Sequence, residues 1–348
     1  MSSTHPARWW DPPDHRGRIR CTLCPRECRL GDGQAGFCFL RQHRDGELVT
    51  LGYGRTTGFA VDPIEKKPLN HFFPATDILS FGTAGCNLGC KFCQNWTSSK
   101  ARTLDRGASP VSPDEVVALA TSRGCPSIAF TYNDPVIFAE YAIDVAERAH
   151  AAGLHTVAVT AGYISAGARE EFFAHMDAAN VDMKSMSGEF YRKLAAAKLE
   201  PVLETLEYLA RETDVWVEVT NLVIPGYNDS GADLESLSQW VVEHMGPLVP
   251  IHFSAFHPDF KLTHLPRTPT DTLSRAREIA VKNGARHVFT GNVMDERGQS
   301  SYCPGCGELV IKRRWYQIAD YRLDADGRCA ACGAEVGGRF GPGVGQAS

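Results

Sequence analysis

The sequence predicts an α/β fold in which a partial (β/α)6 barrel follows a cysteine-rich segment and precedes a small metal-ribbon domain. Three observations lead to this prediction. Short apolar stretches alternate with helical stretches from residue 78 to residue 290, which is typical of a parallel sheet built from βαβ units. Most of the twelve cysteines fall into three short groups. The chain has 348 residues, enough for a barrel with additions at both ends.

Shifts in composition set the expected boundaries. A flexible arm rich in Pro, Arg and His covers residues 1–20, and the cysteine-rich segment covers residues 21–75. The partial barrel spans residues 76–295 and the metal ribbon residues 300–338. The final segment, residues 339–348, reads as a flexible Gly-containing tail.

The barrel elements follow one another in order. The apolar runs predict strands at Ile78–Gly82, Ser127–Tyr132, Thr156–Thr160, Val181–Lys184, Val215–Leu222, Ile251–Phe256 and His287–Thr290. The stretches between them predict helices from Pro113, then at Val136–Ala151, Ala166–Met176, Glu189–Arg211 with a break near Pro201, Leu234–His244 and Thr270–Asn283. Six βα units and a last strand are too few for a closed eightfold barrel, so a partial barrel is favoured over an open doubly wound sheet.

Local signals support two of the expected elements. Ser112 can cap the helix that begins at Pro113, with acidic residues in its first turn and Gly124 beyond its end. In the cysteine-rich segment, the turn Asp45-Gly46 precedes Glu47–Leu51 and predicts a short hairpin.

The composition excludes several function classes. Hydrophobic residues make up 43% and charged residues 22%, so the bulk of the chain can bury a core. Lys and Arg total 36 against 41 Asp and Glu, a net charge of −5, which argues against nucleic acid or an anionic membrane as partner. No apolar run is long enough to span a bilayer, and the N-terminus lacks the apolar core of a signal peptide. We therefore expect a cytoplasmic chain.

The grouped cysteines indicate metal or redox chemistry. Thiols of a chain without an export signal stay reduced, so disulfides are not expected. Buried cysteines acting as small hydrophobes are the alternative, and this suits the isolated Cys125. The three groups sit instead among Gly, Pro, Arg and Asn residues, which favours metal ligation.

The central group is Cys86-x3-Cys90-x2-Cys93, placed in the loop after the first barrel strand. Three thiolates on one loop can hold three irons of a [4Fe–4S] cube and leave the fourth iron open to a small molecule. Phe92 can shield such a cluster from water. Structural zinc is the alternative, but it prefers four ligands and this loop offers three.

These cysteines, with an aromatic residue before the third, resemble the cluster motif of radical S-adenosylmethionine (SAM) enzymes. The chain resembles more closely the AmmeMemoRadiSam-type radical SAM proteins, which are related to pyruvate formate-lyase activating enzymes. The resemblance spans roughly residues 20–338 and rests on the segments Asp62–Phe72, Gly85–Trp96, Thr131–Pro135, Val181–Ser185, Asn221–Asp229 and His252–Pro258.

The resemblance implies that Cys86, Cys90 and Cys93 hold a [4Fe–4S] cluster whose open iron is chelated by SAM. It further implies reductive cleavage to a 5′-deoxyadenosyl radical that abstracts hydrogen from a substrate. The SAM contacts that it implies are Asn133, Asp134, Thr160, Asp182 and Lys184. The family usually carries Glu where this chain has Asp134, which is one methylene shorter. Asp182 and Lys184 also suit a plain ion pair at the barrel rim.

Three further residues near the strand ends have more modest expected roles. Gly226 more plausibly serves a backbone turn than chemistry. A histidine at the rim is more often hydrogen-bonded than catalytic, which applies to His252 and leaves His257 a weak substrate-side candidate.

The last cysteine group forms two Cys-x2-Cys knuckles, each followed by glycine. Four thiolates make a closed tetrahedral site that suits structural zinc or a rubredoxin-like iron; the ligands are Cys303, Cys306, Cys329 and Cys332. Hairpins from Leu309–Ile311 and Tyr316–Tyr321 would complete a zinc ribbon, and the basic run Lys312–Tyr316 reads as a solvated face.

The N-terminal group is less regular in its spacing. Zinc or an auxiliary [4Fe–4S] cluster would fit its four thiols, which are Cys21, Cys24, Cys28 and Cys38.

Three functions remain open at this point. The first is a radical SAM enzyme acting on an unidentified substrate, for which a protein is one option; its implied partners are a flavodoxin- or ferredoxin-type electron donor and Memo-like and AMMECR-like proteins. The second, within the same class, is a glycyl-radical-enzyme activase, although the ribbon is an addition that such activases do not need. The third is a metal-stapled binding scaffold without catalysis.

Overall fold

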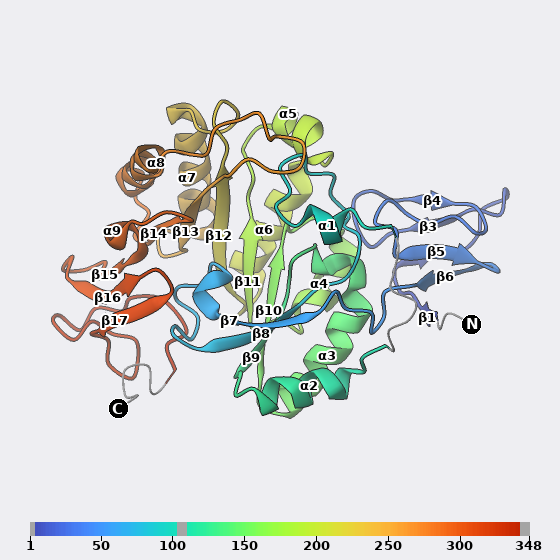
Figure 1. Ribbon diagram of the computed structural model, residues 1–348, viewed down its shortest axis with the longest axis horizontal. Coiled ribbons are helices and arrows are strands. Elements are labelled where there is room, and N and C mark those ends of the chain that lie inside the picture. The colour runs from blue at the N-terminus through green and yellow to red at the C-terminus, as the bar shows by residue number, and fades with distance from the viewer. Residues whose placement is uncertain (1–3, 103–109, 342–348) are drawn as a thin grey trace. The chain divides into compact units, whose positions relative to one another are not determined.

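The computed structural model describes residues 4–102 and 110–341 (Figure 1). The described residues fall into two compact units. The first comprises the chain up to Asp62 together with Asp77–Asp177 and Tyr191–Thr205. The second comprises Pro63–Thr76, Ala178–Phe190 and the chain from Leu206 onward.

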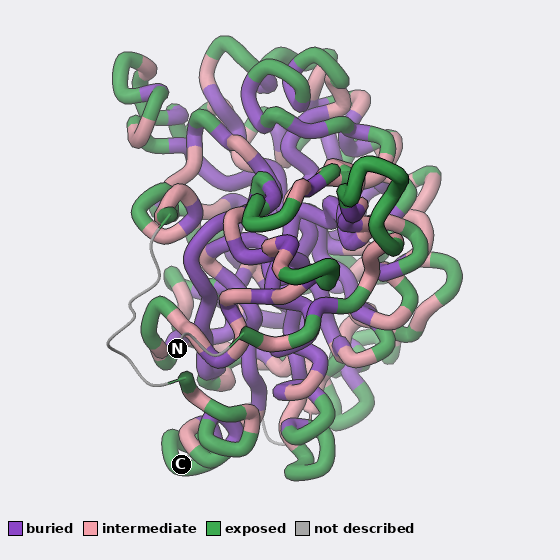
Figure 2. The backbone as a smooth tube through the Cα atoms, turned by 90° about the vertical axis from the view of Figure 1, so that its right-hand side faces the viewer, coloured by how far each residue is buried: buried purple, intermediate pink, exposed green. Residues whose placement is uncertain are grey.

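The main sheet has eight strands in the order β14-β13-β12-β11-β10-β9-β8-β7. Strands β8 to β10 pair in parallel, as do β11 to β14, and most of their residues are buried (Figure 2). The strands are β7 (Phe59–Pro63), β8 (Asp77–Phe81), β9 (Ser127–Phe130), β10 (His155–Thr160), β11 (Ala178–Asp182), β12 (Trp216–Val223), β13 (Ile251–Ala255) and β14 (Val288–Gly291). This is the predicted partial barrel, with β7 added at its edge.

Helices connect the successive parallel strands, as a right-handed βαβ arrangement requires. The six connecting helices are α2 (Pro113–Ser122), α3 (Ala139–Ala151), α4 (Ala166–Phe173), α6 (Glu200–Glu212), α7 (Gly231–Met245) and α8 (Thr270–Lys282). Shorter helical pieces are α1 (Trp96–Ser99), α5 (Gly188–Phe190), α9 (Glu296–Gln299) and the turns η1 (Ile64–Lys66) and η2 (Pro135–Phe138). Among the described residues, no helix combines the length and apolarity that crossing a bilayer would take.

The predicted start of α2 is confirmed. Ser112 accepts a hydrogen bond from the backbone N–H of Glu115, whose carboxylate accepts one from the N–H of Ser112 in return. Pro113 occupies the first turn, and Gly124 adopts φ +68° beyond the last turn. The reciprocal cap satisfies two N–H groups that the helix itself leaves unpaired.

The predicted break near Pro201 lies earlier in the chain. A π-helical turn, η3 (Tyr191–Ala195), ends the first segment, and Pro201 sits in the first turn of α6, where its missing N–H costs nothing. The carbonyls of Leu194 and Ala195 accept hydrogen bonds from the N–H groups of Lys91 and Gly89. These carbonyls are thereby used outside the helix, which gives a physical reason for the interruption.

The N-terminal segment carries more regular structure than predicted. Instead of a flexible arm, the described part of residues 1–20 contributes to two small antiparallel sheets. These are β1-β6-β5 and β2-β3-β4, formed by β1 (His5–Pro6), β2 (Trp10–Asp11), β3 (Ile19–Cys21), β4 (Arg29–Leu30), β5 (Arg41–Arg44) and β6 (Glu47–Thr50). The predicted hairpin is confirmed as β5–β6, with Asp45 and Gly46 at positive φ. A buried ion pair of 2.7 Å joins Arg41 Nη1 to Glu140 Oε1 on α3.

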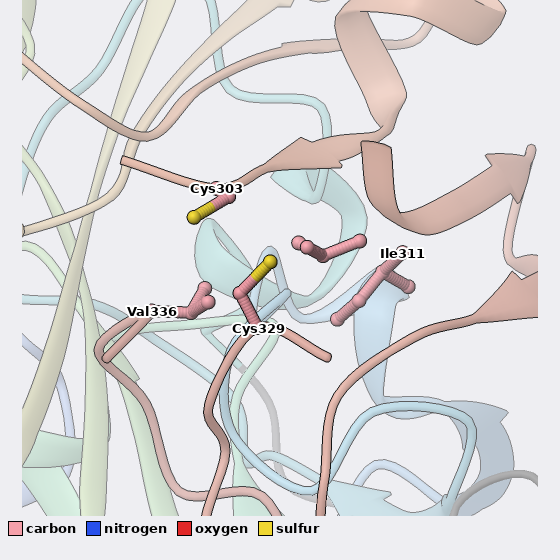
Figure 3. Close-up of a cluster of buried hydrophobic side chains, with 5 residues drawn as sticks. Cys303, Ile311, Cys329 and Val336 are labelled. Carbon is pink, nitrogen blue, oxygen red and sulfur yellow. The ribbon is translucent and has the colours of Figure 1, made fainter. Parts of the chain in front are cut away.

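The C-terminal ribbon belongs to the second unit. Strands β15 (Ser301–Tyr302), β16 (Leu309–Arg314) and β17 (Gln317–Tyr321) form its antiparallel sheet. A small buried core consists of Cys303, Val310, Ile311, Cys329 and Val336 (Figure 3).

Buried polar groups attach the ribbon to the rest of the second unit. The two ring nitrogens of His71 bond to the Gly337 carbonyl and the Ser301 hydroxyl, each at 2.8 Å. His287 Nε2 donates to the Val336 carbonyl at 2.6 Å. Burial holds the pKa of His71 well below its usual range and lowers the pKa of His287 to about 4. Both rings are therefore neutral at pH 7.

The basic run Lys312–Tyr316 was expected to be a solvated face, and this is wrong for Arg313. Its side chain is 1% exposed, and its Nη2 and Nη1 donate to the Asn70 carbonyl at 2.6 Å and to Ser301 Oγ at 2.9 Å. The buried positive charge of Arg313 is stabilised by the Glu65 carboxylate and the Asn70 carbonyl. Both partners are distant in sequence, so residue spacing alone does not reveal these contacts.

The low pKa of His287 predicts acid sensitivity of the fold. The unfolded chain takes up a proton near pH 6.5 and the folded chain only near pH 4, so stability falls as the pH drops through this window, by roughly 3 kcal/mol. Urea unfolding of His287→Gln, which keeps a donor for Val336, should show a shallower loss of stability between these pH values. The exposed His257→Gln serves as the control, and identical pH profiles for both variants and the parent would contradict the account.

Candidate metal centres

The loop between β8 and α1 carries the three central cysteines in the first unit. Cys90 is buried, and Cys86 and Cys93 are half-buried. The loop backbone is held at several points. Gly85 N donates to the Ser98 carbonyl at 3.0 Å, and Lys100 Nζ donates to the Leu88 carbonyl at 2.8 Å. The π-helical turn accepts from Gly89 and Lys91, as described above. The thiols therefore stand on a restrained loop at the carboxyl end of β8, where parallel α/β folds place their active sites.

Gly85, directly before the first cysteine, tolerates no side chain. It adopts φ +88°, and a Cβ atom there would lie 2.1 Å from the carbonyl oxygen of Cys38. The N-terminal cysteine segment is thus packed against the backbone of the central loop. Arg26 strengthens this contact, since its guanidinium donates to the carbonyls of Asn87 and Ala196 and lies 3.4 Å from the Phe37 ring centroid.

The electrostatics of the central loop suit a cationic cluster. Burial raises the pKa of Cys86 to about 12, and the charges of Asp134 and Cys90 act in the same direction. A thiolate is costly here unless a metal offsets its charge, and metals bind cysteine as thiolate. Soft sulfur donors on a loop with backbone N–H groups nearby fit a [4Fe–4S] cluster. Phe92 is 4% exposed, in keeping with its expected shielding role.

The side chain of Asn133 hydrogen-bonds to the backbone and to a side chain of the segment that leads into the cysteine loop. Its Oδ1 accepts from Thr83 N at 3.0 Å, and its Nδ2 donates to the Gly85 carbonyl at 2.9 Å and to Thr83 Oγ1 at 3.0 Å. The side chain predicted as a SAM contact therefore links β9 to the backbone just before Cys86. Its described contacts are those of a loop-positioning residue.

Asp134 and Thr160, both predicted as SAM contacts, are brought together in the first unit. Asp134 Oδ1 accepts from Thr160 Oγ1 at 2.9 Å and from Val136 N at 3.1 Å. Asp134 Oδ2 accepts from Ala161 N at 3.2 Å. The carboxylate thus caps η2 and joins the ends of β9 and β10.

Asp182 and Lys184 form an ion pair in the second unit. Lys184 Nζ lies 3.0 Å from Asp182 Oδ2, the last residue of β11, whereas Lys184 lies just past the strand. Two asparagines that the sequence analysis did not single out fix this backbone. Asn228 Nδ2 donates to the Lys184 carbonyl at 2.7 Å, and Asn221 Nδ2 donates to the Met183 carbonyl at 2.8 Å. Their place inside the segment Asn221–Asp229 was the only available signal.

The remaining rim residues have structural contacts. His252 is buried, and its Nε2 lies 2.6 Å from Glu218 Oε2, as expected for a hydrogen-bonded rim histidine. His257 is exposed. Gly226 adopts φ +76°, and its N–H donates to Asp229 Oδ1 at 2.9 Å, which is a turn contact.

The ribbon cysteines form a metal site. The sulfur atoms of Cys303, Cys306, Cys329 and Cys332 all lie within 4.8 Å of one another, with Cys303–Cys332 at 3.6 Å and Cys306–Cys329 at 3.8 Å (Figure 3 shows two of the four). Metal–sulfur bonds of about 2.3 Å in a tetrahedron place sulfur atoms at about this separation. Gly307 and Gly333 donate their N–H groups to the carbonyls of Cys303 and Cys329, which closes the two knuckle turns.

The N-terminal cysteines lie near one another without forming such a compact group. Cys21 and Cys28 are joined by a backbone hydrogen bond of 3.0 Å between their N–H and C=O groups. Burial raises the pKa of Cys24 strongly, and the charges of Cys21, Cys38 and Cys28 add to this. Within the described residues, only the ribbon group brings three or more potential ligand atoms this close together.

Comparisons with known proteins bear on the family and the fold. The family described as the radical SAM superfamily matches residues 81–237. The uncharacterized protein MJ0808 of Methanocaldococcus jannaschii is 41% identical over 321 residues, which cover 92% of this chain and 95% of that protein. The isethionate sulfite-lyase activating enzyme of Oleidesulfovibrio alaskensis is 26% identical over 243 residues, covering 67% and 76%. A crystal structure of a radical SAM methyltransferase from Sphaerobacter thermophilus shares the fold, with a TM-score of 0.52, 15% identity, and coverage of 89% of this chain and 82% of that one.

The packing at Gly85 predicts that Gly85→Ala loses most of its iron. The added Cβ would meet the Cys38 carbonyl, and the left-handed backbone adds about 1–2 kcal/mol of strain. Iron and sulfide are measured after anaerobic reconstitution. Gly167→Ala is the matched control, because a Cβ there meets nothing within 4 Å. Normal iron content in Gly85→Ala would show that the loop is not so constrained.

The ribbon geometry predicts that Cys329→Ser loses one metal ion per chain. Removal of one sulfur opens a four-ligand site and exposes the small ribbon core to unfolding. Zinc and iron are counted by elemental analysis, and ribbon order is followed by limited proteolysis. Cys125→Ser should keep the full metal content. Equal metal content in both variants would exclude the site.

Proposed function

Because the chain belongs to the radical SAM superfamily, we propose that it cleaves SAM reductively at a [4Fe–4S] cluster held by Cys86, Cys90 and Cys93, and that the resulting 5′-deoxyadenosyl radical abstracts hydrogen from a substrate. The observation that carries the proposal is the restrained loop that presents three thiols at the carboxyl end of β8. When bound, the cluster supplies the electron for SAM cleavage.

The chain's own residues do the positioning. Asn133 and Gly85 fix the backbone before Cys86, so the thiols keep their spacing. We assign Asn133 to this task. Asp134 follows β9, and Thr160 ends β10. We propose that Asp134 accepts from the amino group of SAM, and that Thr160, which donates to the Asp134 carboxylate, lies on the ribose side of SAM.

Asp182 and Lys184 are proposed as further SAM contacts. Their ion pair is 3.0 Å long, but the Asp182 side chain is 38% exposed and can exchange its partner for a ribose hydroxyl. Lys184 would then pair with the SAM carboxylate. The two asparagines that hold the Lys184 backbone support a fixed position for this residue.

A glycyl-radical-enzyme activase is the second candidate. The 26% identity to the isethionate sulfite-lyase activating enzyme favours it, since that protein is named as such an activase. Its substrate would be a glycine-containing loop of a partner protein. We further propose a flavodoxin- or ferredoxin-type reductant, with Memo-like and AMMECR-like proteins as partners to be tested.

The N-terminal cysteines are proposed to hold a second metal centre, either zinc or an auxiliary iron–sulfur cluster. Two observations support a metal centre here. Cys21, Cys24 and Cys38 are buried, and their thiolates would repel one another. A bound cation offsets both of these unfavourable contributions to thiolate formation. Their contact with Gly85 would place this centre beside the central loop.

The radical proposal predicts cluster-dependent formation of 5′-deoxyadenosine. The full chain is reconstituted anaerobically with iron and sulfide, supplied with SAM and dithionite, and the nucleoside is quantified. Cys93→Ala should form none, whereas Cys125→Ala should match the parent. A reducible cluster that yields no 5′-deoxyadenosine, even with the Memo-like and AMMECR-like proteins added, would favour the scaffold. A glycyl radical signal on a partner would single out the activase.

The N-terminal proposal predicts that Cys24→Ser lowers the total iron or zinc per chain while the ribbon metal stays bound. Elemental analysis and Mössbauer spectra of the iron-loaded protein distinguish the three centres. An unchanged metal content would show that these thiols are free.

A further inference from the structure

A small polar pocket in the second unit has no part in the sites described above. The segment after β7, strand β13, the residues after β14 and the β16–β17 turn of the ribbon contribute to its lining. The lining residues that matter here are Glu65, Asn70, His252, Ser254, Arg313 and Trp315. The Glu65 and Arg313 side chains are only 2% and 1% exposed, whereas Trp315 is exposed.

Two buried atoms of this lining have hydrogen-bonding capacity that no described residue uses. Glu65 Oε1 accepts from Ala75 N at 2.9 Å, but Glu65 Oε2 has no partner. The two terminal nitrogens of Arg313 donate to the Asn70 carbonyl and the Ser301 hydroxyl, but Arg313 Nε has no hydrogen bond. One unused atom is an acceptor and the other a donor, so a matching ligand must both donate and accept.

The charges around the pocket favour a neutral ligand. Glu65 Oε1 lies 3.8 Å from Arg313 Nε. His252, which lines the pocket, is paired with the carboxylate of Glu218, which does not line it. Lys66 also lines the pocket. Acidic and basic groups therefore balance, and a ligand with a net charge would be buried without a counter-charge. A carboxamide carries an N–H donor and a C=O acceptor without net charge.

The pocket faces the same side of the sheet as Asp182, one of the proposed SAM contacts, which belongs to the same unit. Asp182 on β11 is level with Thr220 on β12, which is level with His252 on β13 (Figure 1 shows the three strands). Level residues of parallel strands point to one face, and Ser254 follows on that face two residues later. Two strand spacings separate β11 from β13, about 10 Å. A group in the pocket would therefore lie one small molecule away from Asp182.

We propose that this pocket is a substrate subsite that binds a carboxamide group, as found in amino-acid amides and peptides. Both unused atoms are buried, so a small rotation of the Glu65 and Arg313 side chains lets the amide N–H donate to Glu65 Oε2 and the amide C=O accept from Arg313 Nε. Asn70 and Ser254 also line the pocket and complete the site. This inference rests on the proposed radical SAM function, which supplies the neighbouring reaction.

The test compares three probes that share one skeleton. Propionamide, propionate and propylamine are titrated into the full, reconstituted, SAM-loaded chain without reductant, and binding is followed by ligand-observed NMR. The neutral amide should bind about tenfold tighter than the two charged probes, since it alone matches both unused atoms. Ser254→Val, which fills the pocket, and Glu65→Gln should weaken amide binding by about tenfold. Arg314→Gln, on an exposed neighbour, should not.

The outcomes separate this inference from the proposed function. Equal binding of the three probes, or unchanged amide binding in a folded, zinc-replete Ser254→Val, would overturn the subsite and leave a pocket for ordered water only. The same holds if the parent forms 5′-deoxyadenosine but binds no amide. If the parent binds the amide but never forms 5′-deoxyadenosine, the proposed function fails, and the assignment of the pocket to a substrate fails with it.

Discussion

The cysteine loop after β8 is the constraint on which the account depends. Its backbone is held from three directions, by Asn133 in the loop after β9, by the carbonyls of the π-helical turn and by the Cys38 carbonyl against Gly85. These contacts keep three thiols in place where isolated thiolates would repel one another. A cluster can then bind without first ordering the loop, which reduces the entropic cost of loading it. The interrupted helix before Pro201 contributes directly to this restraint, since the carbonyls of Leu194 and Ala195 accept from the loop.

The second unit is organised differently, around buried polar groups. Glu218 accepts from the backbone N–H groups of Asn70 and His71 and from His252, and although burial opposes ionisation, these donors hold the pKa of its carboxyl below the usual range. His71 and Arg313 extend the network to the ribbon. A ribbon that carries a four-cysteine metal site is thus joined to the sheet of the second unit by buried hydrogen bonds. Its turn at Trp315 thereby becomes part of a pocket lining.

The sequence was informative where the signal is local and misleading where contacts are distant. The six βα units, the Ser112 cap and the ribbon ligands follow from periodicity, capping chemistry and ligand spacing, all of which act over a few residues. Burial of Arg313 depends on Asn70, more than two hundred residues away, and no local pattern reveals it. The strands within residues 1–20 were missed because they are only two or three residues long and form by pairing with later segments. Asn133 lay in a recognised motif, but only the structure reveals that its side chain hydrogen-bonds to the backbone before Cys86.

The central claim is that the three thiols hold a cluster with one iron open to SAM. Electron paramagnetic resonance of the dithionite-reduced, reconstituted chain, recorded with and without SAM, tests it most directly. We predict a [4Fe–4S]⁺ signal in the parent whose g-values change when SAM is added, because the ligand of the open iron changes. A reduced-cluster signal that SAM leaves unchanged, at concentrations where binding is shown independently, would contradict the account.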